Sequence, residues 1–167
     1  MMTRFGLVLL YAILSPSVAV AGATITSADT GYSVTFPVQP RKTLTKEKGV
    51  SLALYLVRDG DNIFASQEGF YSEIKDVQAE LEANLANFVK QLDSEITFKR
   101  NADFITTAGK TLRARQFSFE GTKFAGKGIA VASGRCTCII MVAATSIKPN
   151  GKNVANDKFL SSFKIDK

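Results

Sequence analysis

The hydrophobic residues of the chain follow two spacings, and the change from one to the other divides the sequence. Over most of the chain, apolar residues alternate with polar ones or form short runs, which is typical of β-strands. Between residues 74 and 92 they recur instead every three or four positions, with charged side chains between them. That spacing places the apolar side chains on one face of a helix. The sequence therefore predicts strands on both sides of one amphipathic helix.

Turn-forming residues mark where the predicted strands end. Tyr32–Phe36 alternates and stops at Pro37, and Asp59-Gly60 is a strong two-residue hairpin signal. That turn joins the predicted strands Val50–Val57 and Asn62–Phe70. Further segments with a strand pattern are 23–27, 42–47, 95–105 and 110–119.

The segment 122–145 carries two β-rich apolar runs joined at Ser133-Gly134, and we predict a β-hairpin there. Its second run, Cys136–Ala144, is apolar at consecutive positions, so both of its faces need cover. This run is therefore predicted to be a central strand. A two-residue loop would place Ala132 opposite Arg135.

Two helices complete the predicted fold. The longer one covers about Asp76–Asp93, and a shorter one covers Val154–Phe163. Because hairpins lie before and between these helices, the order favours an antiparallel sheet over parallel βαβ units. We predict an α+β domain in which a long helix and a short C-terminal helix pack on the faces of an antiparallel β-sheet, an α/β/α sandwich. Residues 22–167 form one domain in this interpretation.

The first 21 residues have the pattern of a secretory signal peptide. Arg4 gives a positive start, Phe5–Leu14 an apolar run, and Ala19-Val20-Ala21 a small-x-small cleavage signal. The apolar run is short for a membrane span. We expect cleavage near Ala21/Gly22 and a periplasmic or secreted protein that is not an integral membrane protein after cleavage.

The amino-acid composition limits the kinds of catalysis, metal binding and partner that are open to the protein. The chain contains no histidine, which excludes Ser-His-Asp and Cys-His catalysis and histidine-bound zinc. Its net charge of +6 becomes +5 in the mature chain, with 20 basic and 15 acidic residues, because Arg4 is lost with the leader. The basic residues are scattered, which favours an anionic partner weakly and argues against nucleic acid.

Short motifs across most of the mature chain resemble those of the PsbP-like family. They are Tyr32-Ser33-Val34-Thr35-Phe36-Pro37, the mid-chain amphipathic helix, the later strands punctuated by glycine, and Phe159-Leu160-Ser161-Ser162-Phe163. That family is an α/β/α sandwich shared by photosystem II extrinsic subunits, a nuclear-import factor and many small exported bacterial proteins. The resemblance implies binding or accessory roles, and it carries no catalytic or ligand residue over to this chain.

Cys136 and Cys138 bear the most reactive side chains of the sequence. In an extended strand their Cα atoms would lie roughly 6.6 Å apart with parallel side chains, which argues against a disulfide between them. The ordinary interpretation is two small core residues beside Ile129 and Val131. The alternative is a redox pair or a soft-metal carrier for Cu(I), because free thiols are unusual in an oxidising compartment.

One candidate site combines two arginines with two glycines. If the loop at Glu120-Gly121 has two or four residues, Arg113 and Arg115 share a face of the sheet with Gly126 and Gly128. The small residues of this face leave room for a packing helix or a ligand. With a ligand, two guanidinium groups would form a shallow seat for carboxylate or phosphate. Alternatively, both arginines are solvated cover of the sheet.

Together these features predict a non-catalytic exported accessory or binding protein with no cofactor. Its partner would be an unknown protein or an anionic component of the cell envelope. An enzyme is the competing class, and a pocket with converging titratable groups would favour it.

Overall fold

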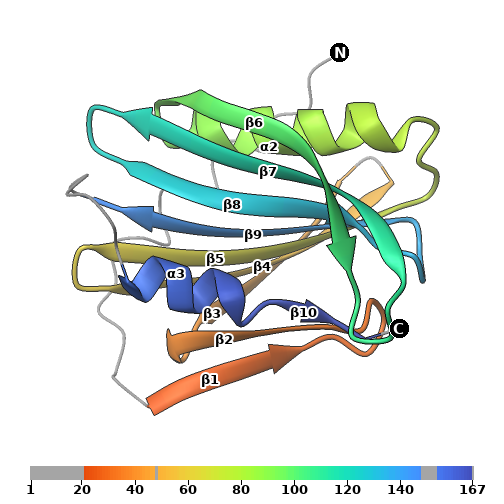
Figure 1. Ribbon diagram of the computed structural model, residues 1–167, viewed down its shortest axis with the longest axis horizontal. Helices are drawn as coiled ribbons and strands as arrows, with labels where there is room; N and C mark the ends of the chain where they lie inside the picture. Colours follow the sequence, from red (N-terminus) through yellow and green to blue (C-terminus); the bar gives the residue numbers. More distant parts are fainter. Residues whose placement is uncertain (1–20, 48, 148–153, 167) are drawn as a thin grey trace.

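The computed structural model describes residues 21–47, 49–147 and 154–166 (Figure 1). The strands are β1 (Ala21–Thr26), β2 (Tyr32–Val38), β3 (Arg41–Glu47), β4 (Val50–Asp59), β5 (Asn62–Tyr71), β6 (Ser94–Ile105), β7 (Thr111–Gly121), β8 (Ala125–Ala132), β9 (Cys138–Ser146) and β10 (Lys164–Ile165). The helices are α2 (Val77–Gln91) and α3 (Val154–Ser161).

Seven of these strands form one antiparallel sheet in the order β3-β4-β5-β9-β8-β7-β6. The fourth position belongs to β9, and all nine of its residues are buried. A strand apolar on both faces is stable only where both faces are covered. The prediction of a central strand in this part of the chain is therefore confirmed.

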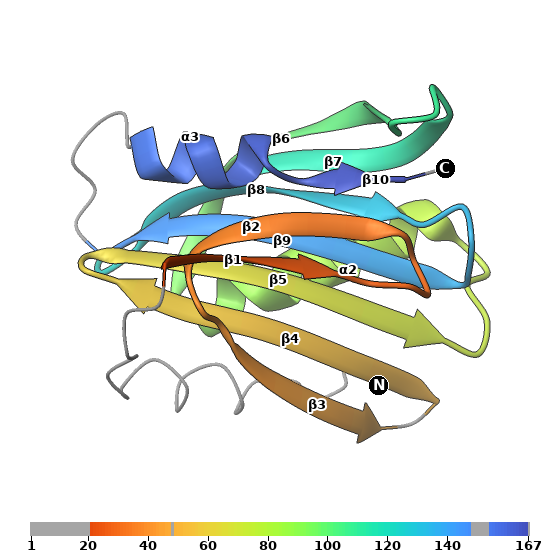
Figure 2. The same ribbon diagram turned by 90° about the horizontal axis from the view of Figure 1, so that it is seen from below.

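Each face of the large sheet packs against a different layer (Figures 1 and 2). Helix α2 covers one face and encloses a core that includes Leu54, Leu81, Leu85, Phe88, Phe117, Phe119 and Met141. The other face packs against α3 and a three-stranded sheet of order β1-β2-β10. The core on that side includes Tyr32, Val34, Phe36, Phe64, Ile140, Val142, Phe159 and Phe163.

Helix α2 begins where the sequence supplies a cap. Asp76 accepts hydrogen bonds from the backbone nitrogens of Gln78 and Ala79 at 2.9 and 3.1 Å, which satisfies two donors that a helix start leaves free. The predicted helix is confirmed to within two residues at its C-terminal end, where Asp93 takes a positive φ of 50° and turns the chain into β6.

The predicted α/β/α sandwich with a long helix is wrong. The described chain is mainly β: helix α2 has 15 residues, α3 has eight, and ten strands form two sheets. The N-terminal strands do not join the main sheet. Instead, Phe36 and Tyr32 of β2 turn inward against the aromatic side chains of α3 and the segment after it, at 5.0 Å between the rings of Phe36 and Phe159. Most of this outer layer is therefore sheet, because β2 hydrogen-bonds to β1 and β10.

The predicted register of the 122–145 hairpin is also wrong. Ala132 lies opposite Ile139 rather than Arg135, because Cys136 and Thr137 belong to the connecting loop. The shift is by four positions, an even number, so every paired side chain of β8 and β9 stays on its predicted face.

The predicted signal peptide falls almost entirely outside the described residues. The predicted leader lies there except for Ala21, which opens β1 and pairs with Val38. Residues 148–153 also lie outside the described part of the chain. Neither helix in the described part has the length and apolar character needed to cross a bilayer.

Candidate functional site

The structure brings Arg113, Arg115, Gly126 and Gly128 to one face of the large sheet. Glu120 of β7 lies opposite Ala125 of β8, so four residues separate the paired positions, and Arg115 lies opposite Ala130. This is one of the two loop lengths that keep the predicted parity. The face is the one that α2 covers.

The two glycines do not form an open surface. A Cβ atom on Gly128 would meet Cζ of Phe117 at 2.6 Å, and one on Gly126 would meet Cζ of Phe119 at 2.7 Å. Both phenylalanines are buried, and their rings pack edge-on against Phe88 of α2. Glycine is required here because the rings lie directly over the backbone of the neighbouring strand.

Arg115 is engaged by α2. Its Nη2 lies 2.5 Å from Oε1 of Glu82, while Nζ of Lys99 lies 2.6 Å from Oε2 of the same carboxylate. With its amide oxygen turned toward the guanidinium, Gln78 accepts from Arg115 at 2.6 and 2.7 Å. Slight burial by itself raises the pKa of Glu82, but Lys99 and Arg115 outweigh it and hold that pKa below its usual value.

Arg113 lies two residues before Arg115 on β7, and its side chain is exposed. It is opposite Asp103 of β6 and borders a shallow hollow with Gln78 and Asn101. The two arginines thus have different surroundings: Arg115 is part of the contact between sheet and helix, and Arg113 remains available at the surface.

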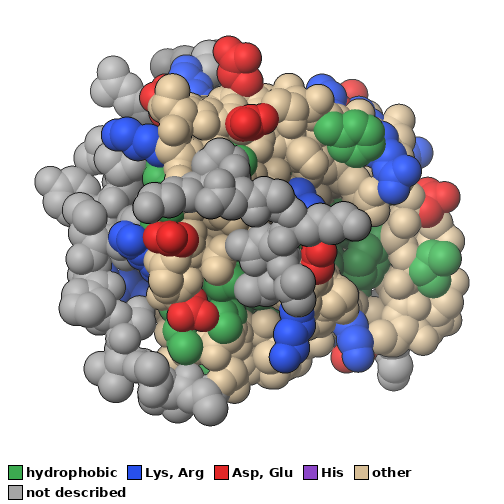
Figure 3. All heavy atoms as spheres, turned by 60° about the vertical axis from the view of Figure 1, so that its left-hand side comes forward, with side chains coloured by type: hydrophobic (Ala, Val, Ile, Leu, Met, Phe, Trp, Pro, Cys, Tyr) green, Lys and Arg blue, Asp and Glu red, His purple; other side chains and the backbone are tan. Residues whose placement is uncertain are grey.

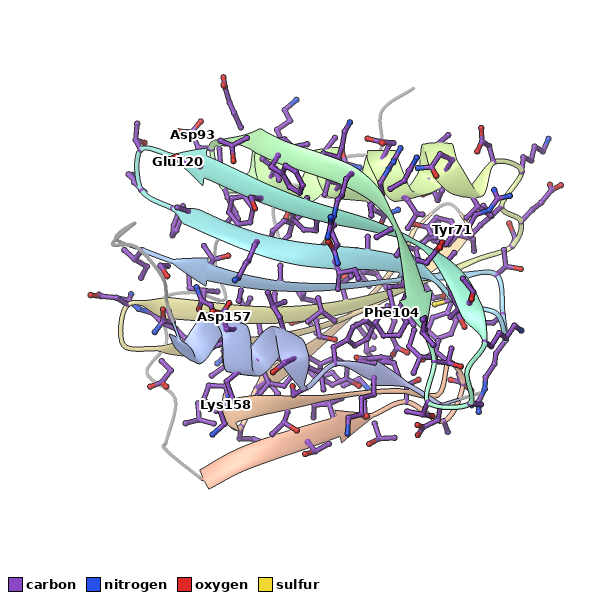
Figure 4. The ribbon with its side chains drawn as sticks, in the orientation of Figure 1. Tyr71, Asp93, Phe104, Glu120, Asp157 and Lys158 are labelled. Carbon is purple, nitrogen blue, oxygen red and sulfur yellow. The ribbon has the colours of Figure 1, made fainter. Side chains whose placement is uncertain are left out.

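A larger groove lies on the opposite face of the sheet. It has a volume of about 440 Å³ and runs along β6, β7 and β8 beside α3. Its apolar lining comes from Phe98, Phe104, Ile105, Ile129, Leu160 and Phe163. In Figure 4, Phe104 and Asp157, which both line the groove, lie toward opposite ends of α3.

A bulge in β6 turns aromatic side chains toward this groove. Ile96 lies opposite Phe119 and Phe98 opposite Ser118, so Thr97 is an extra residue in β6. Such an insertion reverses the faces that follow it. Ile96 therefore packs on the α2 side, whereas Phe98 lines the groove and is 50% exposed.

Polar and charged side chains also line the groove, namely Asp103, Gln116, Lys127 and Asp157, and Arg100 lies next to it. Arg100 of β6 donates from Nε and Nη2 to Oε1 of Gln116, at 2.8 and 2.5 Å, and Gln116 lines the groove. Lys127 of β8 forms an ion pair with Asp157 of α3. Because the described partner of Arg100 is a neutral amide, its positive charge is available to an anion.

Sequence reasoning missed this groove. Strict alternation through 95–105 would put Ile96 and Phe98 on one face, and the bulge that separates them has no clear sequence signal. Phe98, Arg100, Ala102 and Phe104 do alternate after the bulge, and that run could have indicated a mixed apolar and cationic face.

The cysteines lie at the end of the sheet, away from the groove. Cys138 opens β9 and is 1% exposed, whereas Cys136 is half-buried in the loop 133–137. Among residues 21–47, 49–147 and 154–166, no three Cys, Asp or Glu side chains converge as metal ligands would.

A buried polar row lies beside Cys138 on the adjacent strand. Glu68 of β5 is 4% exposed, and its Oε1 accepts a hydrogen bond of 2.6 Å from Oγ1 of Thr30. Ser66 donates to the hydroxyl of Tyr32 at 2.8 Å, and burial raises the pKa of that tyrosine. These bonds tie the turn before β2 to the middle of the large sheet.

Comparison of the chain with protein-family models and with curated proteins finds no match. The resemblance to the PsbP-like family therefore stays a prediction that rests on the short motifs quoted above.

Proposed function

We propose that the protein is a non-catalytic exported binding protein that holds a small amphipathic anion in the groove beside α3. The observation that carries the proposal is an apolar groove lining next to the guanidinium of Arg100, which borders the groove through its hydrogen bonds to the lining residue Gln116. The apolar body of the ligand would lie against Phe98, Ile129 and Phe163. Its carboxylate or phosphate would lie at Arg100.

The dimensions and exposure of the groove support this class of ligand. Its volume of about 440 Å³ falls within the range of about 300–1,000 Å³ that is typical of small-molecule sites. Phe98 and Ile105 are 50% and 68% exposed, so a ligand would remove apolar surface that water now contacts.

The charges on the rest of the surface say less about the class of ligand. Figure 3 shows basic and acidic side chains scattered over one face, with neither kind gathered in one patch. A ligand recognised by one guanidinium within an apolar groove suits this surface better than a polyanion does. The protein would act as an accessory or carrier component of the cell envelope, released from its leader near Gly22.

The test uses decanoate as the anionic probe and decanol as its uncharged counterpart. We expect decanoate to shift the amide resonances of β6–β8 and α3, and decanol to bind the same residues more weakly. Arg100→Ala should weaken decanoate by about tenfold, because a charge-assisted hydrogen bond is lost, and should leave decanol unchanged. Phe98→Ala should weaken both probes.

Two residues on the opposite edge strand serve as matched controls. Arg41 and Leu44 are exposed on β3, so Arg41→Ala and Leu44→Ala should leave both affinities unchanged. Decanoate that fails to shift groove resonances, or that loses as much affinity in Arg41→Ala as in Arg100→Ala, would contradict the proposal.

A further inference from the structure

The loop between β8 and β9 brings the two cysteines closer than a strand would. The backbone nitrogen of Cys138 donates to the carbonyl oxygen of Cys136 at 2.9 Å. A hydrogen bond between residues i and i+2 defines a γ-turn, here centred on Thr137. Extended chain separates such residues by roughly 6.6 Å, near the upper end of the roughly 4.4–6.8 Å that a disulfide allows between Cα atoms. The turn shortens that separation, and the two thiols lie within hydrogen-bonding reach of each other, so the extended geometry assumed from the sequence does not apply.

The turn is held from both sides. Ser133 donates from its backbone nitrogen to the carbonyl of Cys138 at 2.9 Å, and Tyr71 donates in the same way to Thr137 at 2.8 Å. Arg135 lies against Gly31, where a Cβ atom would meet the guanidinium carbon at 2.6 Å. The backbone around the cysteines is therefore fixed by two strands and by the turn before β2.

The two thiols differ in access. Cys138 is 1% exposed and lies beside Glu68, while Cys136 is half-buried at the surface of the loop. Burial raises the pKa of the Cys138 thiol well above its usual value, and the neighbouring Cys136 thiol and the Glu68 carboxylate raise it further. Cys136 is therefore the thiol that an external reagent reaches first, and Cys138 is the one that follows.

We propose that Cys136 and Cys138 form a reversible dithiol–disulfide site that exchanges with disulfide compounds or protein disulfides. In the first step the Cys136 thiolate attacks one sulfur of an external disulfide, which forms a mixed disulfide and releases one thiol. In the second step the Cys138 sulfur attacks the Cys136 sulfur and releases the second thiol. One disulfide bond breaks and one forms, and the two protons of the cysteines end on the two released thiols.

Formation of the disulfide would change the protein surface only at the loop 133–137. Cys136 already packs against the core cluster that contains Cys138, and the loop that it belongs to is the one in which Arg135 contacts the turn before β2. The site is separate from the groove beside α3, so either proposal can fail without the other.

The test treats the reduced full chain with oxidised glutathione under native conditions. Trypsin cleaves after Arg135 and next after Lys152, because Lys148 precedes Pro149, and this yields one peptide, 136–152, that contains both cysteines. We expect this peptide to become lighter by two hydrogen atoms, to resist alkylation, and to recover both reactive thiols after reduction.

Single variants assign the two roles. Cys138→Ser should trap glutathione on Cys136 as a stable mixed disulfide, because the second step is removed. Cys136→Ser should react at least about tenfold more slowly in the native protein, because Cys138 is buried. Urea unfolding of each variant shows that the fold is kept.

Three results would overturn the proposal: both thiols remain free in the treated wild-type protein, glutathione stays on Cys136 without closure, or the two single variants react at equal rates. Stoichiometric Cu(I) uptake by the reduced protein, without disulfide formation in oxidised glutathione, would assign the pair to a soft metal and overturn it as well.

Discussion

Nη2 of Arg115 lies 2.5 Å from Oε1 of Glu82, and this ion pair joins β7 to α2. The side chain of Arg115 is only 12% exposed, so the pair lies largely within the contact between sheet and helix. Arg115 is therefore a structural residue, whatever Arg113 beside it binds at the surface.

The two arginines should differ in their effect on stability. Arg115→Ala leaves Glu82 with Lys99 alone, and we expect it to lower the free energy of unfolding by about 1–2 kcal/mol. Arg113→Ala removes an exposed side chain and should change it by less than about 0.5 kcal/mol. Urea unfolding followed by circular dichroism measures both values.

A double-mutant cycle isolates the pair itself. Arg115→Ala in a Glu82→Gln background should cost less than in the wild-type protein, because the partner charge is already gone. Equal costs in the two backgrounds would show that Arg115 stabilises the protein through packing alone.

The lowered pKa of Glu82 predicts a dependence of stability on acid. In the folded protein this carboxyl binds its proton less readily than in the unfolded chain, where the usual pKa is 4.5. Its contribution is therefore complete above pH 4.5 and is lost as the pH falls through the lowered folded-state value. Urea midpoints measured over this range should converge for wild type and Glu82→Gln as the solution becomes acidic. A constant difference across the range would contradict this assignment.

The ring over Gly128 predicts a steep cost for one added methyl group. In Gly128→Ala the new Cβ atom would lie 2.6 Å from both the Phe117 ring and the carbonyl oxygen of Val142. Because backbone cannot yield as a flexible side chain does, we expect a loss of about 1–3 kcal/mol. In Gly134→Ala the nearest atom is the end of the Lys110 side chain, which can move aside, so thermal unfolding of this control should match wild type.

Export predicts a particular N-terminus. When the full chain is expressed with its first residues intact, protein recovered from the envelope fraction should begin within a few residues of Gly22. N-terminal sequencing checks this, and a membrane-bound chain that still begins at Met1 or Met2 would contradict it.

Local sequence signals predicted most individual elements. Asp59-Gly60 marked the β4–β5 turn to within one residue, since Asp59 pairs with Asn62 and the loop residues are Gly60 and Asp61, and the apolar spacing before residue 92 marked α2. These features depend on neighbouring residues, so one sequence is enough to show them.

Features set by long-range contacts were missed. Strand β10 has two residues and exists because Ile165 lies opposite Tyr32, far away in the sequence. The bulge at Thr97 is likewise visible only against β7. The fold class was wrong for the same reason: whether a segment such as 32–38 joins the main sheet or a second one depends on its partners rather than on its own pattern.

In the candidate site, too, the locally determined features were predicted and those set by long-range contacts were not. Parity along β7 and β8 correctly placed two arginines on the glycine face, because alternation is a local property. That the rings of Phe117 and Phe119 cover those glycines also follows from pairing, since each ring lies opposite the glycine that it covers. The ion pair between Arg115 and Glu82 of α2 could not be predicted, because the rotation of the helix on the sheet does not follow from the sequence pattern.

The position of β9 in the sequence has a consequence for how the molecule folds. Strand β5 ends at Tyr71 and β8 at Ala132, and each needs β9, which begins at Cys138, to complete its pairing. The two meanders β3–β5 and β6–β8 therefore each keep an unpaired edge strand until β9 inserts between them. Closing such distant pairs is slow compared with forming hairpins. For the export proposed above this delay would be useful, because a polypeptide that cannot finish its central sheet early stays unfolded enough to pass through a narrow translocation channel.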